Sequence, residues 1–314
     1  MRRILVAVSA VLLFFVAAYG LFELTEDEAS LIAQDSLGNK SITPPAIVDN
    51  EDIFAAFPGM EHAYEGVLPW EKDERFIKAL ARNKNPFLMA AFSATLPNPL
   101  PGETYNVEIA AKKLAGTVVA PGQIFSQNRT VGPYTRDRGF RPGPTYEGSK
   151  LVTTIGGGVC KVASVLYNVV IFCDLEIIMR YPHAMTVPYV PPGQDATVCF
   201  GVKDLRFRNT TGKPILIWAQ KEGNTLYVGL YGFQKPPKVI WQHQVLKRYS
   251  YWKRYKYNPK LAPGEERVVV DGQEGLLVKS WVTVEKPDGE VVIKRRGTSF
   301  YSPGAEVVER ARRF

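Results

Sequence analysis

Apolar residues recur at helical spacing in two long stretches of the first half of the chain. The stretch from residue 103 to 115 has this pattern, and Gly116 fits a C-cap position. A second helix is expected over residues 159–173, with an apolar stripe made of Val162, Ala163, Leu166, Val169, Val170 and Cys173. A shorter helix is expected within residues 69–86. The pattern therefore places the predicted helices before residue 180.

Alternating apolar and polar residues dominate beyond residue 195. Strands are expected within residues 196–211, 214–232, 238–252 and 264–304, with glycine- and asparagine-containing turns between them. Residues 146–158 predict a short strand or hairpin that leads into three consecutive glycines. The expected fold class is α+β: the helix that bears Cys160 packs on a mostly antiparallel sheet, and a β-rich C-terminal region follows.

An uncharged apolar run covers residues 4–22, directly after Arg2 and Arg3. At about 1.5 Å per residue it extends roughly 28 Å, enough to cross a bilayer core. We expect an N-terminal transmembrane helix with the arginines in the cytoplasm, which makes the protein a single-pass protein of the cell membrane with an extracytoplasmic main body. A cleaved signal peptide is the alternative, because Ala18 and Gly20 are small residues suited to a cleavage site.

These patterns divide the chain into four regions. Residues 1–23 form the transmembrane anchor or an uncleaved signal, and residues 24–100 form a spacer and a short helical region. Residues 101–235 form the central domain, which contains Cys160, and residues 236–314 form the β-rich C-terminal region. A hydrophobic content of 46% and a charged content of 22% are ordinary for a globular protein.

The net charge of +8 suits a protein that works beside anionic material such as lipid headgroups or an acidic wall polymer. The lysines and arginines are scattered and no nucleic-acid-binding motif is present, so no nucleic acid partner is expected. The three histidines are far apart and the cysteines form no paired motif, so neither a metal nor another cofactor is expected. The glycine run also lacks the glycine–lysine–hydroxyl ending of a phosphate-binding loop.

Cys160 follows the three glycines at the expected start of a helix. At about 100° per residue it lies roughly 120° from the centre of the apolar stripe, so it is not a core-stripe residue. The helix dipole and the free amides of the first turn lower the pKa of a thiol placed there. Backbone amides of Gly157, Gly158 and Val159 are candidate donors to an oxyanion. These features suit a nucleophilic cysteine in acyl transfer.

The other two cysteines test this interpretation. Cys173 lies about 20 Å from Cys160 along a continuous helix, too far for a disulfide, and is expected to be a buried hydrophobe. Cys199 is expected to be an inward-facing strand residue. A disulfide between Cys160 and Cys199 stays open from sequence and would exclude the nucleophile.

His183 is the preferred base for a Cys160 thiolate, because His62 lies in the expected spacer and His243 in a late strand. Asp195 is the nearby carboxylate suited to orient this histidine, although capping of a turn explains it equally well.

Four consecutive stretches, residues 121–140, 156–170, 180–198 and 204–217, closely resemble the VanW domain, a family first named from glycopeptide-resistance clusters. The likeness covers roughly residues 100–233. The resemblance implies an exported or membrane-anchored cell-wall protein. Some members of the family act as L,D-transpeptidases through a cysteine that corresponds to Cys160.

Applied to this chain, the resemblance implies a thioester at Cys160 and 3–3 cross-links between peptidoglycan stem peptides. Lys161 stands where the family commonly has glutamine; it is expected to strengthen the thiolate, bind a stem carboxylate or point to solvent. Arg141, Tyr146 and Arg180 are weaker candidates for binding stem-peptide carboxylates, with packing or surface pairing as the alternative.

Two other functions stay open from sequence. A cysteine peptidase of the NlpC/P60 kind forms the same acyl-enzyme and uses water as the acceptor. A non-catalytic wall-binding protein would use the glycine turn for structure alone.

Overall fold

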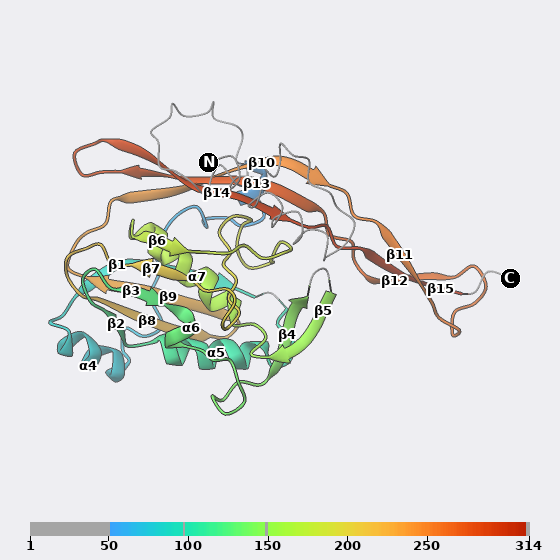
Figure 1. The fold of residues 1–314 in the computed structure, drawn as a ribbon, viewed down its shortest axis with the longest axis horizontal. Helices are drawn as coiled ribbons and strands as arrows, with labels where there is room; N and C mark the ends of the chain where they lie inside the picture. The colour runs from blue at the N-terminus through green and yellow to red at the C-terminus, as the bar shows by residue number, and fades with distance from the viewer. Residues whose placement is uncertain (1–50, 97, 148–149, 312–314) are drawn as a thin grey trace, which may run out of the picture.

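The computed structural model describes residues 51–96, 98–147 and 150–311 of the chain. Two sheets with one helix between them form the centre of the molecule (Figure 1). The membrane anchor expected at residues 4–22 lies outside the described residues. Within the described ranges, no helix is both long and apolar enough to span a bilayer.

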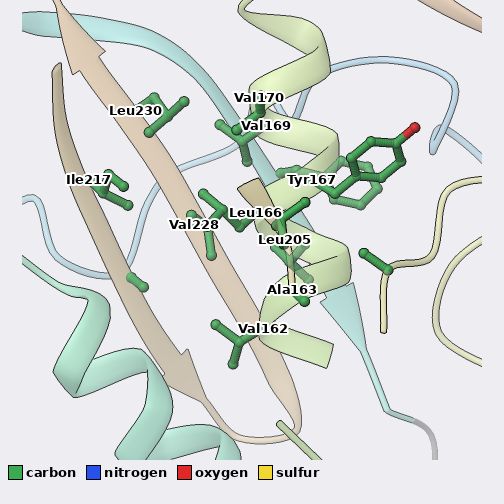
Figure 2. Close-up of a cluster of buried hydrophobic side chains, with 14 of the residues drawn as sticks. Val162, Ala163, Leu166, Tyr167, Val169, Val170, Leu205, Ile217, Val228 and Leu230 are labelled. Atoms are coloured by element: carbon green, nitrogen blue, oxygen red, sulfur yellow. The ribbon is translucent and has the colours of Figure 1, made fainter. Parts of the chain in front are cut away.

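The larger sheet is antiparallel, with strand order β1-β9-β8-β2. Its strands are β1 (Phe87–Thr95), β9 (Thr225–Gly232), β8 (Ile215–Glu222) and β2 (Thr117–Val119). Successive side chains of a strand point to opposite faces, and both faces are covered. On one face, Trp218 and Tyr231 pack against Phe76 of α4 (Glu74–Arg82). On the other face, Ile217 and Leu230 belong to the main core together with helix α7 (Figure 2).

Helix α7 (Cys160–Phe172) is the centre of that core, and every residue from Lys161 to Phe172 is buried. The predicted apolar stripe faces β1 and β9 (Figure 2). On the other side, the ring of Tyr167 lies 5.9 Å from that of Trp241. Helix α5 (Glu103–Leu114) packs beside α7 and over β8. Because α7 is covered on all sides, its sequence is apolar well beyond a single stripe.

Shorter elements surround α7. Strands β3 (Ile124–Ser126), β7 (Arg206–Arg208) and β6 (Glu176–Met179) form a small antiparallel sheet, and α6 (Gln127–Thr130) follows β3. The hairpin of β4 (Pro142–Glu147) and β5 (Lys150–Ile155) leads into the glycine turn before α7. Near the start of the described chain lies α3 (Glu51–Phe54).

The C-terminal part consists of two three-stranded sheets. Strands β10 (Lys238–Tyr249), β13 (Gly275–Glu285) and β14 (Val291–Tyr301) form an antiparallel sheet that covers α7 from the side opposite β1 and β9 (Figure 1). Strands β11 (Lys253–Tyr257), β15 (Glu306–Arg310) and β12 (Glu266–Val270) form the second sheet, in which β11 and β15 are parallel. This second sheet extends away from the rest of the molecule (Figure 1).

The mixed α and β composition, the mostly antiparallel sheets and the β-rich C-terminal part are confirmed. The expected helices are present as α4, α5 and α7. Residues 87–95 differ from the expectation: we assigned them to the spacer and short helical region, but they form β1, which pairs with β9. The segment FLMAAFSAT is largely apolar and mostly buried, so it lacks the polar alternation that indicates a half-exposed strand.

Candidate active site

A glycine turn places Cys160 at the first residue of α7. Strand β5 ends at Ile155, and Gly158 has a φ of +99°, a left-handed conformation that favours glycine. Asn106 of α5 fixes the turn, because its Nδ2 donates to the carbonyl oxygen of Gly157 at 2.9 Å. The thiol therefore lies at the positive end of the helix dipole.

The Cys160 thiol is half-buried and contacts the extended segment that ends at residue 198. Its Sγ accepts hydrogen bonds from the amide of Val198 at 3.4 Å and from the hydroxyl of Thr197 at 3.6 Å. When protonated, the thiol can donate a hydrogen bond to the carbonyl oxygen of Val198, which lies 3.5 Å from Sγ. Two donors aimed at the sulfur favour its ionised form.

Polar residues of α7 hold this segment along the helix. Ser164, one turn after Cys160, accepts from the amide of Ala196 at 2.9 Å, and Asn168, one turn further, donates to the carbonyl oxygen of Gln194 at 2.8 Å. Four residues of helix advance about 6.0 Å, and two residues of extended chain advance about 6.6 Å. The two spacings match, so one side of α7 binds alternate residues of the segment that carries Asp195.

His183 and Asp195 form a tight pair beside the thiol. One carboxylate oxygen, Oδ2 of Asp195, lies 2.7 Å from Nδ1 of His183 and accepts from the backbone amide of His183 at 2.7 Å. Both side chains are nearly excluded from solvent, with 9% and 1% of their surface exposed. Because Nδ1 is bonded to the carboxylate, Nε2 is the ring nitrogen left to face the thiol. The three residues selected from sequence thus lie together.

The charges of Cys160 and His183 support each other. Burial opposes a charged His183, but its hydrogen bonds to Asp195 and Cys160 raise its pKa from 6.5 to about 9. Burial likewise opposes a thiolate, but the hydrogen bond and charge of His183, with the Val198 amide and the Thr197 hydroxyl, leave the pKa of Cys160 below its ordinary value. A thiolate–imidazolium pair is the form that attacks carbonyl carbon.

Arg180, a weaker candidate for binding a stem-peptide carboxylate, is hydrogen-bonded to Asp195 and Ser299 in the structure. Its Nη2 lies 2.9 Å from Oδ1 of Asp195, its Nε donates to the Asp195 carbonyl oxygen at 2.7 Å, and its Nη1 donates to Ser299 at 2.8 Å. Burial opposes an Asp195 charge, but the guanidinium and His183 hold the pKa of this carboxyl well below its usual range. Arg180 therefore stabilises the ionised Asp195.

Lys161 is not directed at solvent. It is buried, and its Nζ donates to the carbonyl oxygen of Asn224 at 2.9 Å, in the turn between β8 and β9. Burial lowers its pKa to about 8, and the nearby Glu103 carboxylate partly opposes this shift. The ammonium group is thus hydrogen-bonded within the protein, to the β8–β9 turn.

Arg141 is exposed, and its guanidinium lies 3.8 Å from the centre of the Tyr105 ring. Both residues line a surface hollow of about 650 Å³ between the start of α5 and the β4–β5 hairpin. Tyr146 belongs to β4, but its side chain lies outside the described part of the structure.

Hydrogen bonds within the turn occupy two of the three amides selected as oxyanion donors. The amide of Gly157 donates to Thr154 at 3.2 Å and that of Val159 to Gly156 at 3.3 Å. Among the described residues, the amides of Gly158 and Cys160 have no acceptor. These two are the better candidates for stabilising an oxyanion.

Several residues around the thiol were not selected as site residues from the sequence. Ser164 and Asn168 follow Cys160 at intervals of four, and the helical period places them on the same side of the helix as Cys160. Thr197 had no such signal, and neither did Tyr301, which is 106 residues from Asp195 and donates to its Oδ1.

All three cysteines are free, so Cys160 and Cys199 are not paired. Cys173 is buried, and burial raises the pKa of its thiol. The expectation for Cys199 was wrong: it is exposed, because the chain turns back immediately after it and its amide bonds to Lys203.

Two curated relatives are similar to this chain. The vancomycin B-type resistance protein VanW of Enterococcus faecalis is 31% identical over 145 residues, which is 45% of this chain and 52% of that protein. The uncharacterized protein YoaR of Bacillus subtilis is 42% identical over 128 residues, 41% of this chain and 42% of that protein. The chain thus spans about half the length of these relatives or less.

Two solved G5 domains, one from an IgA1 protease and one named HP0197-G5, are also similar to part of the chain. They match 26% and 23% of it at 22% and 13% identity, cover 98% and 97% of their own chains, and have TM-scores of 0.17 and 0.15. The family model described as VanW like protein matches residues 102–231, which include Cys160, His183 and Asp195. This segment belongs to the VanW-like protein family.

Proposed function

We propose that this protein is a cysteine acyltransferase of the cell wall, an L,D-transpeptidase that forms 3–3 cross-links between peptidoglycan stem peptides. The observation that carries the proposal is the arrangement of Cys160, His183 and Asp195 at the start of α7. The cell wall as the place of action is supported by the VanW-like family and by the resistance protein among the relatives.

In the first half-reaction, the Cys160 thiolate attacks the carbonyl carbon of the third residue of a stem tetrapeptide. The amides of Cys160 and Gly158 and the helix dipole stabilise the negative charge on the carbonyl oxygen. The imidazolium of His183 then gives its proton to the nitrogen of the terminal D-alanine. The peptide bond breaks, D-alanine leaves and a thioester remains on Cys160.

In the second half-reaction, a side-chain amine of another stem attacks the thioester carbonyl. Neutral His183 takes the proton of that amine, the sulfur leaves as a thiolate, and an amide bond between the two stems forms. Asp195 stays ionised throughout and keeps Nδ1 of His183 in one tautomer. We further propose that residues 4–22 anchor the protein in the cell membrane, with the catalytic part on the wall side.

The test is incubation of the purified full chain, in detergent, with a disaccharide tetrapeptide, followed by chromatography of the products. The Cys160→Ala variant is the matched control. Cross-linked dimers that lack one terminal alanine, formed by the wild type alone, would support transpeptidation. Shortened stems without dimers would indicate the peptidase. No product from a chain with a reduced, reactive Cys160 would favour a binding protein.

A further inference from the structure

The carboxylate of Asp195 is held by groups from two parts of the chain. Its Oδ2 is bonded to His183, as described above. Its Oδ1 accepts hydrogen bonds from Nη2 of Arg180 at 2.9 Å and from the hydroxyl of Tyr301. Tyr301 is the last residue of β14, in the C-terminal sheet and outside the segment that matches the VanW-like family.

The Tyr301 hydroxyl makes two hydrogen bonds that fix its direction. It donates its single proton to Asp195 and accepts from the amide of Gly193 at 2.6 Å. Tyr301 is fully buried. Since a phenol has one proton to donate, these bonds join residues 193 and 195 to β14 in one defined orientation.

The same strand supports the other partner of Asp195. Ser299 lies two residues before Tyr301, so both side chains point to the same face of β14, and Ser299 accepts from Nη1 of Arg180 at 2.8 Å. Gly193 lies so close to the neighbouring strand that a Cβ atom there would be 2.1 Å from the hydroxyl oxygen of Ser280, and its φ is +99°. The C-terminal sheet thus contacts Asp195, Gly193 just before it, and Arg180, which is hydrogen-bonded to its carboxylate.

We propose that Tyr301 is a positioning residue of the active site, and that the C-terminal sheet is a required part of the catalytic unit. The inference rests on the proposed role of Cys160 as nucleophile. Without the hydroxyl, the buried amide of Gly193 has no acceptor and Oδ1 retains Arg180 alone. Asp195 then turns more freely, its hold on His183 weakens, and the imidazolium stabilises the thiolate less.

The experiment measures the rate of alkylation of Cys160 by iodoacetamide between about pH 5 and pH 10 in the full chain, because iodoacetamide reports the thiolate without any wall substrate. Peptide mapping by mass spectrometry separates Cys160 from Cys173 and Cys199. In Tyr301→Phe we expect the midpoint for Cys160 to rise by about one pH unit, a roughly tenfold lower rate at about pH 6. Ser299→Ala should shift it less, in the same direction.

Tyr231→Phe is the matched control. Its hydroxyl is also buried and accepts from Trp70 Nε1 at 2.7 Å, on the face of the larger sheet away from α7. We expect lower thermal stability and an unchanged Cys160 midpoint. Two results would overturn the role of Tyr301 and leave the proposed nucleophile untouched. One is a Tyr301→Phe alkylation profile that superimposes on the wild type, and the other is an equal shift of the Cys160 midpoint in Tyr231→Phe. A wild-type midpoint near the ordinary thiol pKa of about 8.5 would overturn the proposed nucleophile as well.

Discussion

The charge of Asp195 is expected to set the ionisation of the whole site, and Asp195→Asn tests this with little change of shape. Asp195, together with Cys160, raises the pKa of His183 against the effect of burial, so that it reaches about 9 instead of 6.5. This difference corresponds to about 3 kcal/mol in favour of the imidazolium. Without the carboxylate charge, burial dominates, and the pKa of His183 should fall to about 6.5 or lower.

The loss extends to the thiol. At about pH 7.5 the wild-type His183 is an imidazolium, whereas in Asp195→Asn it is neutral and no longer favours the thiolate. The pKa of Cys160 should then rise by one to two units, and alkylation by iodoacetamide at about pH 7.5 should slow by up to roughly 10- to 100-fold. The stability supplied by His183 is complete below about pH 6.5 and is lost as the pH rises through about 9. The destabilisation of the variant should therefore shrink over that range.

The assay is the pH profile of alkylation at Cys160, read by peptide mapping, with unfolding followed in parallel by circular dichroism. Asp204→Asn is the control, because Asp204 is also buried and accepts from Ser126 at 2.6 Å and from the amide of Asn128 at 3.0 Å. It should lose stability with little change in the profile. An unchanged Cys160 midpoint in Asp195→Asn, with the variant still folded, would show that the charge of Asp195 does not control the thiol.

Three further variants probe the surroundings of the thiol. Ser164→Ala removes the acceptor of the Ala196 amide and should cost about 1–3 kcal/mol of unfolding free energy, measured by urea titration, with slower alkylation of Cys160; unchanged values would contradict the role of this bond. Lys161→Met keeps the buried aliphatic stem and removes the ammonium. Product formation should persist, and thermal stability at about pH 7 should rise because a buried charge is removed. Loss of product would show that Lys161 takes part in the reaction. Cys199→Ser should keep full product formation, because Cys199 is exposed and unpaired, and a loss would assign it a part in the reaction.

The local pattern of residues predicted the start of the site well. The three glycines before Cys160 predicted the start of a helix. The helical period then predicted which of its side chains face the core, and it placed Cys160 outside that stripe. The pairing of His183 with Asp195 required only that two residues twelve apart share one loop, which the turn-rich segment between them permits.

The rest depends on contacts that no local pattern contains. Tyr301 reaches Asp195 because the C-terminal sheet packs over α7, and the sequence near β14 gives no sign of that docking. The sequence around Arg180 does not distinguish an arginine that binds a substrate carboxylate from one that binds Asp195. Strand β1 is apolar on both faces, so its membership of the sheet follows from pairing with β9 and not from alternation.

The most direct test of the account is peptide mapping of the full chain after incubation with a disaccharide tetrapeptide. We predict a disaccharide–tripeptide acyl group on Cys160, removable by hydroxylamine as a thioester and absent from Cys160→Ala. An unmodified Cys160 that still reacts with iodoacetamide in the same sample would contradict it.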